Sequence, residues 1–469
     1  MDEKKRMADK ILKDVEKSDK AAALCAEAKK LYAEKKFKEA IKIWRTAAES
    51  KSAEALYMLG ICYNYYLGVE DEVSKEECGA AASGYFLKAA ELGHAEAQCF
   101  TALCYNYGIG VEKDQEKMLY WFNKSAEQNC TRAMNNLAYF ADNGIGVKNP
   151  DKQYEESFAW YKRSADLGDA IGQTGVGDCY FDGKGVKKDI QEALKWYRLA
   201  AEQGNADALF GLGYCYDYGL GVHRNITQAF EYYKKAAMLN HGKAQCYIGY
   251  FYESGEGVAR NLPEAITWYE RSAANNYFQA FCNLGCLYEQ GVGVKRDIHK
   301  ALEMYERAGE LGCAMALSNI AKVYEFGKGG VKSDMNLAME YYEKAAREGD
   351  EEAQFNLGQH YLKGDCVEQN EELAAYWFLQ AAENGDSDAQ CKIGTLYMQG
   401  IGVEEDEEKG FQWIHEAALQ EDVDALYLTG LCYQEGMGVE ADLDEARDWY
   451  ERAAELGDKR SKKALKKLK

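Results

Sequence analysis

The stretch that decides the fold is Ala208–Asn240, which reads ALFGLGYCYDYGLGVHRNITQAFEYYKKAAMLN. Its first half carries small or apolar side chains at the spacing of one helix face: Ala208, Leu212, Gly213 and Tyr216. Gly219 and Gly221 then end that helix, because glycine enters left-handed backbone without steric cost. A second apolar stripe follows at Ala229, Tyr232, Tyr233, Ala236 and Ala237. The stretch therefore predicts two antiparallel helices joined by a tight glycine turn.

This unit is repeated along most of the chain. The valine that follows the turn recurs at 69, 111, 147, 186, 222, 258, 294, 331, 367, 403 and 439, and most steps between neighbours are 36 residues. Three residues after the valine, the later copies carry an acid or amide that can cap the second helix: Asp189, Asn225, Asn261, Asp297, Asp334, Asn370, Asp406 and Asp442. A fixed period of this length indicates stacked repeats rather than one globular core.

The repeated pattern is A-x-x-x-L-G-x-x-Y-x-x-G-x-G-V-x-x-D, followed by A-x-x-W-Y-x-x-A-A-x-x-G. It resembles the Sel-one-like repeat, a relative of the tetratricopeptide repeat, over roughly residues 20–458. The resemblance implies an all-α fold, a right-handed superhelical α-solenoid of about twelve antiparallel helix pairs.

The repeats divide the chain into four parts. Residues 1–18 form a polar lead, and residues 19–50 resemble a tetratricopeptide pair that caps the N-terminal end. Residues 51–458 hold eleven Sel-one-like repeats, and residues 459–469 form a lysine-rich helix that caps the C-terminal end. The first full repeat has an insertion after Val69, which is either a functional loop or tolerated extra length.

Composition excludes several classes of partner and compartment. The 57 basic and 78 acidic residues give a formal charge of −21, which argues against nucleic acid or an anionic membrane surface. The acidity either keeps a long solenoid in solution or selects a partner. The fifteen cysteines form no CxxC motif, and no apolar leader or membrane-spanning segment is apparent. We therefore expect reduced thiols in a cytoplasmic protein.

The sequence gives no sign of catalysis, so we expect a protein that is not an enzyme and that has no cofactor and no metal site. The G-x-G triplets are turns between helices, and the six histidines are scattered singly. Cys282 and Cys286 share one helix face without a further Cys or His in register, which favours a packing role. Four Trp-Tyr pairs, at 160–161, 196–197, 268–269 and 449–450, fall on the predicted inner stripe and are expected in the core.

Helical phase indicates which first-helix residues face a concave groove, the surface that binds partners in tetratricopeptide relatives. The predicted binding residues are Tyr139, Asp142, Tyr214, Asp217, Tyr218, Tyr250, Glu253, Asn283, Glu289, Asn319, Glu325 and Asn356. Amides can grip an extended peptide backbone by donating and accepting together. Acids beside tyrosines favour a cationic, partly apolar partner.

The sequence thus predicts a scaffold or adaptor that binds a protein or peptide. A partner with a basic segment is one of the options that the acidic groove residues leave open. Three alternatives stay open: a regulatory subunit that controls a bound enzyme, a binder of a small ligand in the groove, and an enzyme with a site in the insertion after Val69. The oligomeric state also stays open, because the ends of repeat arrays can stack on one another.

Overall fold

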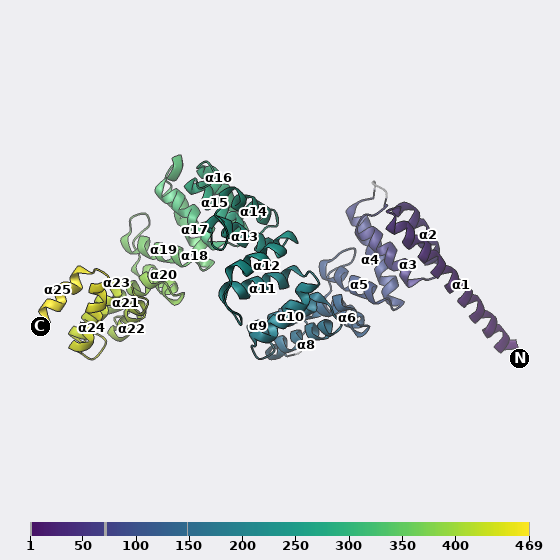
Figure 1. Ribbon diagram of the computed structural model, residues 1–469, viewed down its shortest axis with the longest axis horizontal. Coiled ribbons are helices and arrows are strands. Elements are labelled where there is room, and N and C mark those ends of the chain that lie inside the picture. Colours follow the sequence, from purple (N-terminus) through teal and green to yellow (C-terminus); the bar gives the residue numbers. More distant parts are fainter. Residues whose placement is uncertain (1, 70–72, 148, 469) are drawn as a thin grey trace. The chain divides into compact units, whose positions relative to one another are not determined.

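The computed structural model describes residues 2–69, 73–147 and 149–468, with side chains from Lys17 onward. Throughout these ranges the regular structure is helical, without a strand (Figure 1). The helices are α1 Asp2–Ala33, α2 Phe37–Glu49, α3 Ala53–Asn64, α4 Lys75–Glu91, α5 Ala95–Tyr107, α6 Gln115–Glu127, α7 Thr131–Asp142, α8 Gln153–Asp166, α9 Ala170–Asp182, α10 Ile190–Glu202, α11 Ala206–Tyr218, α12 Ile226–Met238, α13 Gly242–Ser254, α14 Leu262–Ala274, α15 Phe278–Gln290, α16 Ile298–Glu310, α17 Ala314–Phe326, α18 Met335–Arg347, α19 Glu351–Lys363, α20 Glu371–Glu383, α21 Ser387–Gln399, α22 Glu407–Leu419, α23 Val423–Glu435, α24 Leu443–Glu455 and α25 Lys459–Lys467. The predicted all-α solenoid of paired helices is confirmed.

The helix pairs fall into two compact units. Unit 1 comprises Met1–Ala236 and unit 2 comprises Ala237–Lys469. In each unit, odd-numbered helices up to α23 are the first members of a pair and even-numbered helices the second. Each helix packs against the next along the chain from α1 to α11 in unit 1 and from α13 to α25 in unit 2. None of the described helices combines the length and the apolar composition that crossing a bilayer requires.

The predicted caps of the second helices are all present. Each of the eight acids or amides three residues after the turn valine accepts a hydrogen bond from a backbone N–H of the helix that it begins, as Asp297 does from Lys300 at 3.1 Å. These side chains satisfy donors that the helix itself cannot pair. The period of the caps therefore fixes where each second helix begins.

The second turn glycine decides how closely successive repeats approach. Gly185 has φ +69°, and a Cβ atom there would overlap the carbonyl oxygen of Tyr154 in the preceding repeat. Gly402 and Gly438 approach Glu371 and Glu407 of their preceding repeats in the same way. A side chain at Gly185, Gly402 or Gly438 would force these neighbouring repeats apart, so at these three positions glycine serves packing as well as the turn.

The core of each repeat is built around one second-helix side chain. This residue is fully or almost fully buried as Trp44, Phe86, Phe122, Tyr197, Tyr233, Tyr269, Tyr305, Tyr342, Phe378, Ile414 and Tyr450. In most repeats its ring lies against a glycine of the first helix, as Tyr305 does against Gly285. The closeness of the two helices thus depends on a large residue opposite a very small one.

The core prediction for the Trp-Tyr pairs is correct in part. Trp268 and Trp449 are buried, but Trp160 and Trp196 are only half-buried. Lys162 lies over the Trp196 ring at 5.3 Å from its centroid, on the side that remains accessible. Tyr197, Tyr269 and Tyr450 are buried, whereas Tyr161 is only half-buried. Adjacent residues on a helix point about 100° apart, so in three of the four pairs the tyrosine takes the central buried position and the tryptophan lies at its edge.

The ends and insertions vary most. α1 begins at Asp2, so the predicted polar lead is continuous with the first repeat-like helix. Part of the insertion after Val69 lies outside the described residues, and Ser74 ends it by forming a capping box with Glu77 at the start of α4. The extra residues of the third repeat include a short 3₁₀ turn, Pro150–Lys152, which Asn149 caps. α25 is capped by Asp458 and packs against α24.

The turn geometry makes a testable prediction in unit 1. Gly185 and Gly204 both have positive φ, but only Gly185 faces backbone from the preceding repeat. Gly204→Ala should lower the free energy of unfolding by about 1–2 kcal/mol through left-handed strain. Gly185→Ala should cost about 1–3 kcal/mol more, because the repeats must also separate. Urea unfolding of both variants measures the difference, and equal losses would contradict this role of Gly185.

Candidate partner-binding surfaces

The acids predicted to line the groove have a structural role in the repeat. In most repeats whose central residue is tyrosine, its hydroxyl donates a hydrogen bond to the first helix of the same pair. The pairs and their oxygen–oxygen distances are Tyr197–Asp178 2.7 Å, Tyr233–Asp217 3.4 Å, Tyr269–Glu253 2.7 Å, Tyr305–Glu289 2.8 Å, Tyr342–Glu325 2.6 Å and Tyr450–Gln434 3.1 Å. Burial of these hydroxyls requires an acceptor, and the first helix supplies it.

The sequence itself supports this pairing. Where the central residue has no hydroxyl, the corresponding first-helix position carries no acid. This position holds Asn106 in the repeat of Phe122, Leu362 in that of Phe378, and Met398 in that of Ile414. An acid at this position therefore occurs only with a tyrosine, while Tyr197 and Tyr450 are accompanied there by Phe181 and Gln434. This agreement indicates that Asp217, Glu253, Glu289 and Glu325 are in the first place acceptors for tyrosine, whatever else they bind.

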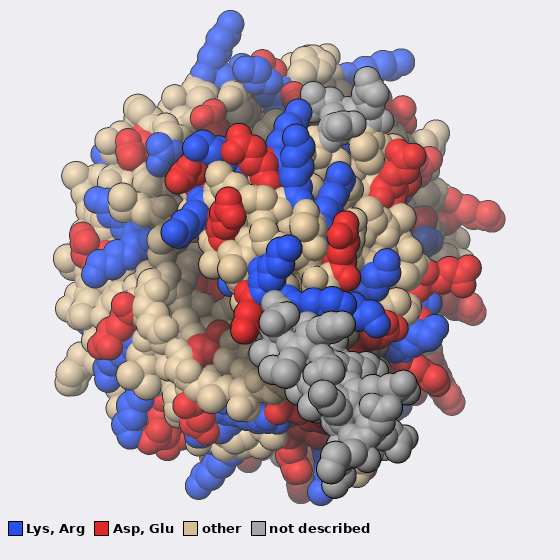
Figure 2. Space-filling model, turned by 90° about the vertical axis from the view of Figure 1, so that its right-hand side faces the viewer, with Lys and Arg blue, Asp and Glu red and all other residues tan. Residues whose placement is uncertain are grey.

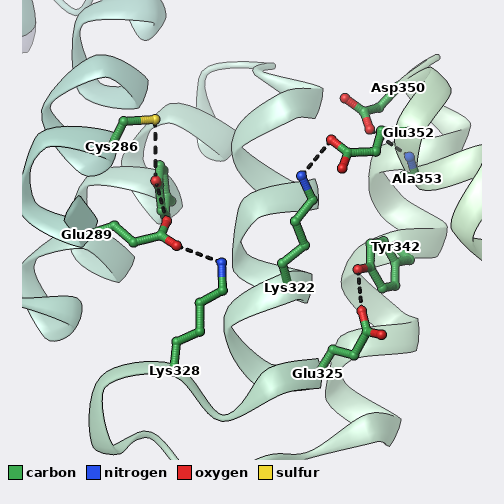
Figure 3. A network of polar contacts seen from close by, with 10 residues as sticks. Cys286, Glu289, Lys322, Glu325, Lys328, Tyr342, Asp350, Glu352 and Ala353 are labelled. Carbon is green, nitrogen blue, oxygen red and sulfur yellow. Dashed lines mark hydrogen bonds and ion pairs between the residues drawn. The ribbon is translucent and has the colours of Figure 1, made fainter. Parts of the chain in front are cut away.

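In unit 2 some of these acids are also ion-paired (Figure 3). Glu289 accepts from Lys328, which lies in the turn after α17, at 2.7 Å. The side chain of Glu325 is only 17 % exposed and lies 3.8 Å from Nε2 of His360. Lys322 on α17 pairs with Glu352 at the start of α19 at 2.5 Å. The acidic stretch of unit 2 is thus partly neutralised by the chain's own cations.

The predicted asparagine row in unit 2 lies beside the same tyrosines. Asn283, Asn319 and Asn356 are each half-buried and follow Tyr269, Tyr305 and Tyr342 by 14 residues. Asn283 lies next to the Tyr269 hydroxyl and Asn356 next to that of Tyr342. Asn283 also accepts from Gln279 at 3.0 Å and donates to Cys246 at 3.6 Å. These amides therefore help to join one repeat to the next.

Tyr250, which is also among the predicted binding residues of unit 2, is exposed.

Unit 1 presents a more open arrangement. Its first helices α7, α9 and α11 are neighbours, with α9 in contact with both others. They carry alternating aromatic and acidic side chains, which we call the aromatic–acidic surface: Tyr139, Asp142, Asp178, Phe181, Asp182, Tyr214, Asp217 and Tyr218. Tyr139 and Tyr218 are 59 % and 56 % exposed. Five of the twelve predicted binding residues lie on this surface, and Asp178, Phe181 and Asp182 complete it.

The aromatic rings of this surface contact one another. Tyr214 lies 4.5 Å from Tyr218 and 6.1 Å from Phe181, measured between ring centroids. Lys188 lies over Phe181 at 5.8 Å from its centroid. The rings are therefore held in place, and one of them already attracts a cation from the chain itself.

One carboxyl of this surface, Asp178, has a shifted pKa. Its side chain reaches solvent, and the neighbouring helices bury much of its surroundings. This crowding raises the pKa of Asp178 to about 6, and Asp207 and Asp182 add to the rise, while the hydrogen bond from Tyr197 opposes it. Asp178 thus changes its charge within the range of ordinary cellular and laboratory pH.

Charge elsewhere is mixed. On the face in Figure 2, lysine and arginine side chains are interspersed with aspartate and glutamate rather than separated from them. The net charge of −21 therefore does not appear there as one acidic patch. The aromatic–acidic surface differs from such mixed surface in its combination of rings and carboxylates.

Comparison with known proteins identifies the repeat. The model of the Sel1 repeat matches eleven consecutive segments: 53–94, 95–130, 131–169, 170–205, 206–241, 242–277, 280–313, 314–350, 351–386, 387–422 and 423–458. The chain belongs to the Sel1 repeat family. The fold is of a kind that generally mediates protein–protein interaction and is generally non-enzymatic.

Two structures of Sel1 repeat proteins are similar over long stretches. One is c5321, a protective antigen of uropathogenic Escherichia coli strains, which is 32% identical, with 91% of this chain and 90% of that chain covered and a TM-score of 0.53. The other is a Sel1 repeat protein from Oxalobacter formigenes, which is 34% identical, with 53% of this chain and 99% of that chain covered and a TM-score of 0.49. No curated protein matches the chain.

The Sel1 repeats also bring together cysteines that are far apart in sequence. Cys282 contacts both Cys286 and Cys313, and Cys99 contacts Cys130. Cys130 and Cys313 each stand just before a first helix, at equivalent positions in their repeats. The expectation that Cys282 and Cys286 have no further thiol nearby is therefore wrong, because Cys313 comes from the next repeat. The sequence contains a signal for this contact. Two cysteines 31 residues apart occur at equivalent positions of two different repeats, as Cys99 with Cys130 and as Cys282 with Cys313.

One group of possible metal ligands occurs in the described part of the chain, namely His360, Asp365 and Cys366. The sequence instead predicts no metal site, because His360 is one of six histidines that are scattered singly. The helix-to-turn geometry after α19 brings the three residues together, although only Asp365 and Cys366 are adjacent in the chain.

The tyrosine–acid pairs make a testable prediction. Glu253→Ala removes the acceptor of the buried Tyr269 hydroxyl and should cost about 1–3 kcal/mol in the free energy of unfolding. Glu253→Gln keeps an acceptor, as Gln434 does for Tyr450, and should cost less than about 1 kcal/mol. Urea unfolding compares the two variants. Equal losses would mean that the acid does not serve the tyrosine.

Proposed function

We propose that the chain is a non-enzymatic scaffold or adaptor that binds a partner protein or peptide on the aromatic–acidic surface of unit 1. The observation that carries the proposal is the row of exposed and half-buried rings and carboxylates on α7, α9 and α11. Exposed aromatic side chains held by their neighbours offer contact area at low entropic cost. The membership of the Sel1 repeat family supports a protein partner.

The chemistry of this surface favours a partner segment that is basic and partly apolar. Asp142, Asp178 and Asp182 attract cations, and the tyrosine faces beside them can bind the same cations or apolar side chains. Nucleic acid is disfavoured by the same carboxylates. The fifteen free thiols, most of them buried, support a reducing compartment such as the cytoplasm.

The seven predicted residues of unit 2 take a smaller part in this proposal. Glu253, Glu289 and Glu325 accept from buried tyrosines, and Glu289 is paired with Lys328. Asn283, Asn319 and Asn356 lie at the same junctions between repeats. We infer that these residues mainly shape unit 2, and that a partner contacts exposed neighbours such as Tyr250. An adaptor that also regulates a bound enzyme would use the same surfaces.

The first test compares capture of partners from the native host's lysate by full-length variants. Tyr218→Ala combined with Asp182→Asn should lose the partners that wild type retains, by about tenfold or more if the tyrosine is a binding hot spot. The matched control is Tyr120→Ala with Glu202→Gln. The exposed fraction of Tyr120 is 54 %, which is similar to that of Tyr218, but Tyr120 lies on a second helix. Quantitative mass spectrometry measures the retained proteins.

Two results would contradict the proposal. Partners that are lost equally from the control variant would indicate nonspecific adhesion to exposed rings. Partners that both variants retain at wild-type levels would place the interface outside unit 1's first helices. Circular dichroism of each variant checks that the fold is intact.

Binding of a basic partner should also depend on pH. Because Asp178 has a pKa of about 6, it is charged at pH 7 and neutral near pH 5, so affinity should fall as the pH is lowered. A histidine-free peptide that alternates lysine and leucine serves as the probe, with fluorescence anisotropy as the measurement. Asp178→Asn should reduce the difference between pH 7 and pH 5. An unchanged difference would assign the pH dependence to another group.

A further inference from the structure

One repeat departs from the others at two positions that meet in space. Its first helix, α19, carries His360 where the other repeats have a buried cysteine or apolar residue: Cys104, Phe140, Cys179, Cys215, Phe251, Leu287, Val323, Leu396 and Cys432. Its turn carries Cys366 at the place of the second glycine, for example Gly402 in the next repeat. Neither change is needed for the fold, since the neighbouring repeats pack without it.

These two residues and Asp365 bring three metal-binding atoms together. One ligand atom from each of His360, Asp365 and Cys366 lies within 4.8 Å of the others. Nδ1 of His360 is 2.9 Å from Oδ1 of Asp365. His360 is buried, Cys366 is half-buried and Asp365 is exposed, so the group opens to solvent on the side of Asp365.

The other side of the imidazole faces a carboxylate. Nε2 of His360 lies 3.8 Å from Oε1 of Glu325, and the second oxygen of Glu325 accepts from Tyr342 at 2.6 Å. Metal-binding histidines usually donate their other ring N–H to such a carboxylate, which fixes the ring and increases its basicity. At 3.8 Å the two atoms are in electrostatic contact and are not hydrogen-bonded, so Glu325 attracts an Nε2–H of His360 while Nδ1 is directed at Asp365.

We propose that His360 Nδ1, the Asp365 carboxylate and the Cys366 thiolate bind one Zn²⁺ ion, with water as the fourth ligand. A set of one nitrogen, one oxygen and one sulfur suits zinc, whereas Ca²⁺ and Mg²⁺ prefer oxygen alone. Binding replaces the His360–Asp365 hydrogen bond with bonds to the metal. The proton on Nδ1 passes to solvent and Nε2 takes one up, so the neutral ring then carries its N–H on the side of Glu325. The Cys366 S–H bond breaks as the S–Zn bond forms, and its proton goes to solvent.

Proton release gives this site a measurable signature. Zinc binds the thiolate form of cysteine and not the thiol. Zinc must therefore displace a proton, and its apparent affinity should increase as the pH rises. The ion would join the turn after α19 to the helix itself, at the junction with Glu325 of the preceding repeat.

The experiment uses reduced, metal-stripped full-length protein. Co²⁺ replaces zinc as a spectroscopic probe, because a cobalt–thiolate bond gives a charge-transfer band in the near ultraviolet. Zn²⁺ affinity is measured by competition with a chromogenic chelator. Wild type should bind one tight equivalent and show the band. Cys366→Gly and His360→Leu, which restore residues that other repeats use, should each lose at least about 100-fold in affinity and remove the band.

Two further variants separate this site from other thiols. Cys391→Ala removes a half-buried cysteine of the same unit and should leave binding unchanged. Cys282→Ala disrupts the thiol cluster with Cys286 and Cys313 and should also leave it unchanged. Glu325→Gln should weaken binding by about tenfold through the orientation of His360. Circular dichroism confirms that each variant is folded.

Clear results would overturn the proposal. Absence of a cobalt–thiolate band in wild type would exclude Cys366 as a metal ligand. A band that persists in Cys366→Gly and disappears in Cys282→Ala would place the metal at the other thiol cluster. If His360→Leu alone failed to fold, the Cys366→Gly result would still decide the question.

Discussion

Each tyrosine-centred repeat depends on one buried tyrosine ring that must satisfy two conditions at once. The ring of Tyr269 fills the space between two helices and lies against Gly249, which has no side chain to obstruct it. Its hydroxyl is carried into the same apolar interior and needs an acceptor there, which Glu253 provides. An unpaired buried hydroxyl costs on the order of 1–3 kcal/mol, comparable to a sizeable fraction of a domain's stability. Glycine, tyrosine and acid therefore form one structural set.

This constraint changes the meaning of the acidic row. A carboxylate that accepts from a buried tyrosine is fixed in direction and partly buried, so it contributes less to a long-range field than a free surface acid. The strongest candidate for partner recognition is consequently a repeat in which the set of glycine, tyrosine and acid is incomplete. In the repeat of α9 and α10, Tyr197 donates to Asp178 instead, and Phe181 occupies the usual acid position. Asp178 thus takes the role of acceptor, and Phe181 and the exposed Asp182 are left to form the aromatic–acidic surface with their neighbours.

The sequence predicted the regular features of the fold correctly. The caps, the glycine turns and the period follow from local backbone chemistry, which does not depend on the neighbouring repeats. The half-burial of Trp196 was not predicted, since the sequence does not show which of two adjacent aromatic residues points at the first helix. The contacts of Cys282 with Cys313 and of His360 with Asp365 depend on how one element faces the next. The tyrosine–acid pairing was visible as joint variation between repeats, at Phe378 with Leu362 for example, but only the structure explains it.

The central claim is that the first-helix acid and the buried tyrosine of a repeat stabilise the fold together and not independently. A double-mutant cycle at Tyr269 and Glu253 tests this claim most directly. Tyr269→Phe and Glu253→Leu together reproduce the pair that Phe378 and Leu362 form elsewhere in the chain. We predict that each single substitution destabilises the protein, while the double variant recovers much of the loss. The expected coupling energy in urea unfolding is about 1–3 kcal/mol. Additive losses, with no coupling, would contradict the account.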